Sequence, residues 1–91
     1  MTTDETMNGV KAVLIECLGT TNPILSSDIL SEDLGADELD YVEITLELET
    51  KFDVLLRDGS EITERTTVKA LADRVQRAIN RRGAPGTKVK P

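Results

Sequence analysis

Apolar residues recur at steps of three and four in three segments of the chain, which is the spacing that places side chains on one face of an α-helix. The first predicted helix runs from about Asp4 to Leu18, the second from about Glu38 to Lys51 and the third from about Val68 to Arg81. Aromatic residues make up only 2% of the 91 residues, so the core must be built from aliphatic side chains. The pattern predicts an all-α fold, an antiparallel bundle of three main helices.

Residues that commonly begin or end a helix flank two of these segments. Thr2, with Glu5 three residues later, matches a capping box at the start of the first helix. Thr66 or Thr67 is the expected N-cap of the third helix, and Gly83 is expected to follow its last turn.

The chain has the length of one small domain. We expect residues 1–82 to form that single helical domain and residues 83–91, which contain two prolines and two glycines, to form a flexible tail. A short extra helical turn is predicted around residues 61–64. The connection over residues 19–37 is long for a domain of this size, and such loops are often functional. Five apolar side chains are expected to attach it to the core: Ile24, Leu25, Ile29, Leu30 and Leu34.

Charge is distributed unevenly along the chain. The net charge is -6, but residues 1–64 contain 16 acidic and 3 basic residues, whereas residues 65–91 contain 1 acidic and 8 basic residues. Between Asp28 and Glu49 there are nine acidic residues and no basic one. This balance makes nucleic acid and anionic membranes poor partners and favours a basic protein surface.

The chain contains no histidine and a single cysteine, Cys17. Catalytic Ser/His or Cys/His pairs and His-containing zinc sites are therefore impossible, and we expect neither enzymatic activity nor a metal. Cys17 cannot form an internal disulfide and is expected to be buried.

Without a secretory leader or a run of roughly 20 apolar residues, the chain is predicted to be cytoplasmic. One later group of oxygen-bearing residues does not match the EF-hand spacing and is predicted to be a solvated acidic turn: Asp58, Ser60, Glu61 and Glu64.

The second predicted helix carries two apolar stripes. They are Ile44, Leu48 and Phe52 on one line, and Leu39, Val42 and Leu46 on another. If one stripe faces the core, the other forms a solvent-facing apolar strip framed by carboxylates. Such a strip is typical of a docking surface for a partner with apolar groups ringed by Lys and Arg. The alternative is that both stripes are buried and the acidic residues only solvate the rest of the helix.

One run of residues resembles a known family. Residues 31–44 read SEDLGADELDYVEI, and Thr66-Thr67-Val68 opens the third helix. The run closely resembles the central motif of acyl carrier proteins, in which Asp-Leu-Gly-Ala-Asp-Ser-Leu-Asp opens helix II. The resemblance covers most of the chain and implies the four-helix bundle of that family, with a long loop after helix I and a short helix III.

The departure from the family falls on the residue that carries its chemistry. Carrier proteins attach 4'-phosphopantetheine to the serine of this signature, and Glu38 occupies that position here. A carboxylate cannot form this phosphodiester, so no cofactor is expected. Glu38 either imitates the charge of the attached phosphate or acts only as a favourable acidic residue at a helix N-terminus. We do not expect 4'-phosphopantetheine to be attached instead to the hydroxyl of Ser31, Tyr41 or Thr45. The sequence leaves open whether the serine was lost naturally or replaced by design.

The resemblance implies two functional classes. The first is a non-loaded interaction module of fatty-acid or polyketide metabolism, a monomer that docks through the acidic second helix to basic surfaces of enzymes or regulators. The alternative is an acyl carrier that transports thioesters on 4'-phosphopantetheine, in a form that cannot be loaded. The predicted partner-binding residues are Asp37, Leu39, Asp40, Val42, Glu43, Leu46 and Glu47.

Overall fold

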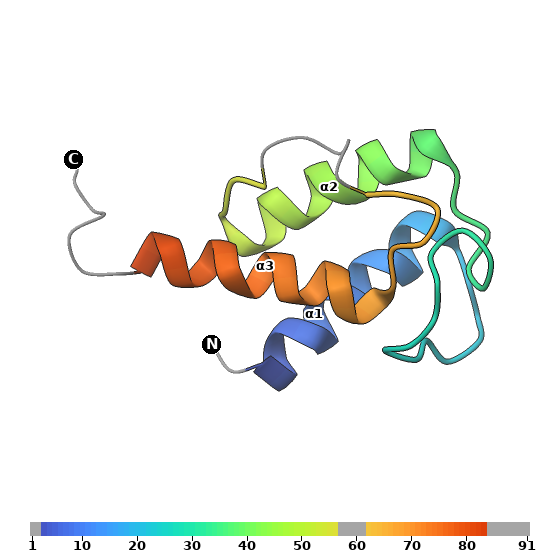
Figure 1. Ribbon diagram of the computed structural model, residues 1–91, viewed down its shortest axis with the longest axis horizontal. Coiled ribbons are helices and arrows are strands. Elements are labelled where there is room, and N and C mark those ends of the chain that lie inside the picture. Colours follow the sequence, from blue (N-terminus) through green and yellow to red (C-terminus); the bar gives the residue numbers. More distant parts are fainter. Residues whose placement is uncertain (1–2, 57–61, 84–91) are drawn as a thin grey trace.

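The computed structural model describes residues 3–56 and 62–83, and over these residues the chain forms three helices and no strand (Figure 1). The helices are α1 (Thr3–Leu18), α2 (Glu38–Phe52) and α3 (Val68–Gly83). The all-α fold class is confirmed, and the predicted ends of all three helices lie within two residues of the observed ones. No helix in the described part of the chain is both long and apolar enough to cross a membrane.

The three helices are not all antiparallel. In Figure 1, α1 runs along the bundle in one direction, and α2 and α3 both run in the other. Accordingly, α2 ends and α3 begins at opposite ends of the bundle (Figure 1). Leu56 and Ile62 are both buried and attach the described parts of the connection between α2 and α3 to the core. The antiparallel prediction therefore holds for α1 against its two neighbours and is wrong for α2 against α3.

The predicted short helix does not form over residues 62–64. The Thr66 N–H donates to the Thr63 carbonyl oxygen at 3.0 Å and closes a turn that leads into α3. Hydroxyl groups accept the neighbouring backbone donors: Thr66 Oγ1 accepts from Thr63 N at 2.9 Å, and Thr63 Oγ1 accepts from Arg65 N at 3.2 Å. Such side chains compete with helical hydrogen bonds. Predictions that concern Thr2, Asp58, Ser60, Glu61 and residues 84–91 lie outside the described residues.

The core is aliphatic, as the composition predicts, and α1 packs against both α2 and α3. Phe52 lies against the backbone of α1, where a Cβ added at Gly9 would be 2.5 Å from the Phe52 Cζ atom. Glycine is therefore required for this close approach. The apolar side chains with no exposed surface are Val10, Leu14, Leu30, Ile44, Leu48, Val68, Leu71 and Val75.

The connection between α1 and α2 is irregular but bonded to the rest of the fold. Ile24 and Leu30 are buried, as predicted. The Leu30 N–H donates to the Thr66 carbonyl at 3.0 Å, and the Val68 N–H donates to the Asp28 carbonyl at 2.9 Å. These bonds hold the connection beside the segment that leads into α3.

Leu25 differs from its prediction, because its side chain is 59% exposed and does not attach the connection to the core. It lies in a tight turn, in which the Leu25 N–H donates to Asp28 Oδ2 at 2.9 Å and the Asp28 N–H donates to the Leu25 carbonyl at 3.0 Å. Ile29 and Leu34 are partly buried.

Both predicted ends of α3 are tested by the structure. Thr67 Oγ1 accepts from the Ala70 N–H at 3.1 Å, which confirms Thr67 as the residue that caps this helix. Gly83 is the last residue of α3 and does not follow it as predicted. The arginines that precede it are good helix formers and extend the helix by two residues beyond Arg81.

Candidate functional site

The two apolar stripes of α2 have different surroundings. The inner stripe is buried in the core and consists of Ile44, Leu48 and Phe52. Leu39, Val42 and Leu46, here called the outer stripe, are 80%, 54% and 57% exposed. The alternative in which both stripes are buried is therefore wrong. Apolar side chains gathered on one exposed helix face mark a candidate interaction surface.

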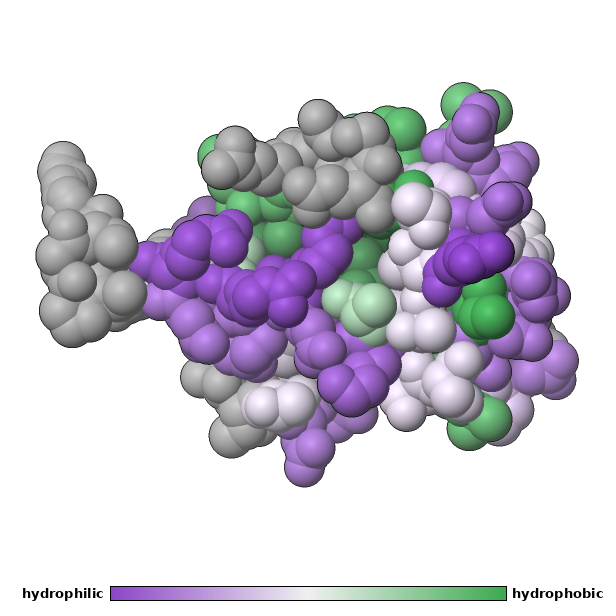
Figure 2. All heavy atoms as spheres, viewed as in Figure 1, coloured by the Kyte–Doolittle hydropathy of each residue, from purple (hydrophilic) through white to green (hydrophobic). Residues whose placement is uncertain are grey.

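Carboxylates beside the outer stripe are not neutralised within the described fold. Glu43 and Glu47 are exposed, and neither side chain makes a hydrogen bond or ion pair with a residue in the ranges 3–56 and 62–83. The ion pair between Lys69 and Asp73, at 2.9 Å, lies within α3. Figure 2 shows hydrophilic residues gathered over α3 and hydrophobic residues along the edge where α2 lies.

Asp37 and Asp40, two of the predicted partner-binding residues, form the N-terminal cap of α2. Asp37 Oδ1 accepts from the Asp40 N–H at 3.0 Å, and Asp40 Oδ2 accepts from the Asp37 N–H at 3.0 Å, which completes a capping box. These two carboxylates stabilise the helix. Their charges still contribute to the negative potential at this end of α2.

The carboxylates of α2 also affect the pKa of the thiol of Cys17, a residue of α1. Burial raises the pKa of the Cys17 thiol, and the carboxylates of Glu43 and Glu47 raise the pKa further by opposing the thiolate, with smaller contributions from Glu16 and Asp40. Cys17 is therefore near the acidic face of α2. It is half-buried against the core and not fully buried as predicted, because it lies at the margin between α1 and this face.

Glu38 is the first residue of α2, and its side chain is exposed. The position is favourable for a carboxylate, because the N-terminal end of a helix carries a partial positive charge. Ser31, the nearest preceding serine, is not at the helix start. Its hydroxyl donates to the Glu64 carbonyl at 2.6 Å. This hydrogen bond joins the segment between α1 and α2 to the segment that precedes α3.

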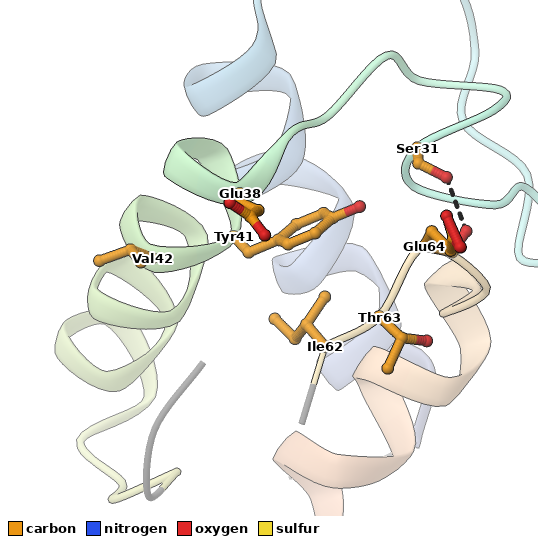
Figure 3. A pocket seen from close by; sticks show the side chains of 7 residues that line it. All are labelled: Ser31, Glu38, Tyr41, Val42, Ile62, Thr63 and Glu64. Carbon is orange, nitrogen blue, oxygen red and sulfur yellow. Dashed lines mark hydrogen bonds between the residues drawn. The ribbon is translucent and has the colours of Figure 1, made fainter. Parts of the chain in front are cut away.

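A cleft of about 880 Å³ lies between the first turns of α2 and the segment that precedes α3 (Figure 3). The described residues that line it are Ser31, Glu38, Tyr41, Val42, Ile62, Thr63 and Glu64. The cleft itself was not predicted from the sequence, although five of these residues are named there for other reasons: Ser31, Glu38, Tyr41, Val42 and Glu64. Tyr41 was a detectable signal, since it is one of only two aromatic residues and lies within the motif of residues 31–44.

Glu64, predicted to belong to a solvated acidic turn, lines this cleft from the opposite side to α2. Among the described residues no group of three or more Cys, Asp or Glu side chains is placed to hold a metal ion.

No protein-family model matches the chain.

Proposed function

We propose that this chain is an acyl-carrier-like docking module that presents α2 to basic surfaces of enzymes or regulators of fatty-acid or polyketide metabolism and carries no acyl group itself. The observation that carries the docking proposal is the exposed outer stripe beside the carboxylates of Glu43 and Glu47, which have no partner among the described residues. The assignment to acyl metabolism rests on the sequence resemblance of residues 31–44.

The two components of this surface have different physical roles. Leu39, Val42 and Leu46 supply apolar area that a partner can remove from water, and full burial of such a side chain is worth about 1.5 to 3 kcal/mol. Glu43 and Glu47 attract a basic partner and accelerate the encounter. α2 can present both without loss of fold, because the residues that it packs into the core, the inner stripe among them, include no member of the outer stripe.

The alternative function, a carrier of acyl thioesters, has less support. Glu38 provides no hydroxyl for the phosphodiester. The Ser31 hydroxyl is hydrogen-bonded to a backbone carbonyl on the far side of the cleft, away from the start of α2. A non-loaded module needs neither group to be modified.

The test is capture of partners from a lysate of the source organism by the native chain and by Glu43→Lys/Glu47→Lys, followed by binding kinetics with each purified partner. We expect the reversed variant to associate more slowly, with a flatter dependence on salt. Leu46→Ala should mainly speed dissociation, by about 1 to 2 kcal/mol.

The matched control is Glu16→Lys/Glu32→Lys, which changes the net charge by the same amount at exposed positions outside α2. Retention of the same partners with unchanged association rates by the Glu43→Lys/Glu47→Lys variant would contradict the proposal. Partners with no role in acyl metabolism would contradict the pathway assignment and leave the docking surface in place.

A further inference from the structure

Tyr41 places a polar group in the cleft beside the outer stripe. Its side chain is only 9% exposed, and its hydroxyl forms no hydrogen bond with any residue in the described ranges. Figure 3 shows the ring extending from α2 into the cleft, with the hydroxyl directed toward Ser31 and Glu64. Burial of the residue holds the ring in place, so the hydroxyl is presented to the cleft at a fixed point, where a ligand can donate a hydrogen bond to it.

The other lining residues define which ligand fits. Val42 and Ile62 are the apolar aliphatic residues among those that line the cleft. Glu38 and Glu64 provide carboxylates on either side of it (Figure 3). None of the described lining residues is basic. A ligand with an anionic head would be repelled by these carboxylates. An aliphatic stem that ends in a cation matches both the aliphatic residues and the charge.

The partial positive charge at the N-terminus of α2 disfavours a cation in the cleft, but only weakly. A helix N-terminus carries roughly half a positive charge. The three carboxylates of Asp37, Glu38 and Asp40 lie at this end of the helix and outweigh it. The net potential at the mouth of the cleft is therefore negative and favours a cation.

We propose that this cleft binds one long basic side chain, an arginine or a lysine, of the protein that docks on α2. The inference rests on the proposed function, because Val42 belongs both to the outer stripe and to the lining of the cleft, so the two surfaces are continuous. The aliphatic stem packs against Val42 and Ile62, and the charged head lies between Glu38 and Glu64. The Tyr41 hydroxyl accepts a hydrogen bond from the head.

The test uses the full chain and small probes, observed by two-dimensional ¹⁵N–¹H NMR. n-Butylguanidinium represents an arginine side chain, n-butylammonium a lysine side chain, n-pentanol a neutral stem and hexanoate an anionic one. We expect saturable shifts of the amide signals of Tyr41, Val42, Ile62 and Thr63 with the two cations. The neutral and anionic probes should bind these residues at least several-fold more weakly.

Three variants separate the contributions. Tyr41→Phe removes only the hydroxyl and should weaken cation binding about 3- to 10-fold, the loss expected for one hydrogen bond. Glu38→Gln and Glu64→Gln should each weaken it about 2- to 5-fold, as for partly exposed charge pairs. Glu16→Gln is the matched control, because it neutralises an exposed carboxylate on α1 outside the cleft, and it should leave binding unchanged.

The proposal is overturned if the cations cause no saturable shifts at these residues, if pentanol or hexanoate binds as well as the cations, or if Tyr41→Phe binds like the native chain. Preferential binding of the neutral or anionic stem would instead make the cleft a site for an aliphatic chain. The titration requires no partner protein, so its failure is distinguishable from failure of the docking proposal, which depends on Glu43 and Glu47.

Discussion

Gly9 allows the Phe52 ring to lie against α1 because it has no Cβ. Gly9→Ala would place a methyl group 2.5 Å from Phe52 Cζ, and the ring is buried, so it has little room to move. Overpacking costs about 1 to 3 kcal/mol, and the better helix propensity of alanine returns up to about 1 kcal/mol. We expect the free energy of unfolding, measured in urea, to fall by up to about 2 kcal/mol.

The control for this prediction is the Phe52→Leu background, in which the atom that meets the new methyl group is absent. There, Gly9→Ala should be neutral or stabilising, because only the helix propensity remains. An equal loss in both backgrounds would show that the contact with Phe52 is not the cause.

Glu38 is a second residue whose identity has a direct test. Incubation of the native chain with coenzyme A and a broad-specificity phosphopantetheinyl transferase should leave its intact mass unchanged, because a carboxylate cannot form the phosphodiester. Glu38→Ser should gain one phosphopantetheine if the resemblance of residues 31–44 to carrier proteins extends to recognition by the enzyme. Glu38→Ala is the control without a hydroxyl. Modification of the native chain would refute the claim and direct attention to Ser31.

At the scale of the element, the two faces of α2 have different roles. The inner stripe stabilises the fold, and the outer stripe is the proposed binding surface. Leu48 is fully buried on the inner stripe, whereas Leu46 is 57% exposed on the outer stripe. We expect Leu48→Ala to lower the free energy of unfolding by about 2 to 5 kcal/mol and Leu46→Ala to change it by no more than about 0.5 kcal/mol. Urea denaturation of the two variants measures both. Unfolding of the chain by Leu46→Ala would place the outer stripe in the core and remove the apolar half of the docking surface.

The acidic face of α2 also has a local reporter in Cys17. Glu43→Gln/Glu47→Gln should lower the pKa of the thiol toward its ordinary value, because two charges that oppose the thiolate are removed. The pKa should stay above that value, since burial is the largest cause of the increase. The measurement is the ultraviolet absorbance of the thiolate as a function of pH. Glu32→Gln, whose carboxylate does not contribute, is the control, and an unchanged pKa in the double variant would contradict the placement of Cys17 beside these charges.

At the scale of the whole molecule, acidic residues dominate the chain up to residue 64 and basic residues dominate after it. The carboxylates of α2 repel one another at positions i, i+3 and i+4, as in Glu43 with Glu47 and Asp40 with Glu43, and each pair costs a few tenths of a kcal/mol at low salt. We therefore expect the melting temperature to rise by about 2 to 4 °C between low and physiological ionic strength.

Glu43→Gln/Glu47→Gln provides the comparison for this salt response. The double variant should melt at a higher temperature at low salt and respond less to added NaCl, because the repulsion has been removed. A flat or falling response of the native chain would mean that the basic residues of α3 already neutralise these acids across the fold.

The three helices, the aliphatic core and a threonine cap at Thr66 or Thr67 could be predicted from the sequence alone, and the structure selects Thr67. Each depends on neighbours within a few positions: a period of three to four residues, the scarcity of aromatic rings, or a hydroxyl three residues before the amide it caps. The two stripes of α2 were detectable for the same reason. Residue spacing within a few positions therefore predicts the amphipathic faces of a helix and its ends.

Only the tertiary structure decided which α2 stripe is buried, which direction α3 takes, and which residues form the cleft. Both stripes are apolar at helical spacing, so the choice depends on where α1 and α3 lie against α2. The exposure of Leu25 depends on a turn closed by Asp28. Tyr41 and Glu64 line facing sides of the cleft although they are far apart in sequence, because the start of α2 lies opposite the segment that precedes α3. Side-chain periodicity carries no information about such distant contacts, since it records only what adjacent turns of one helix share.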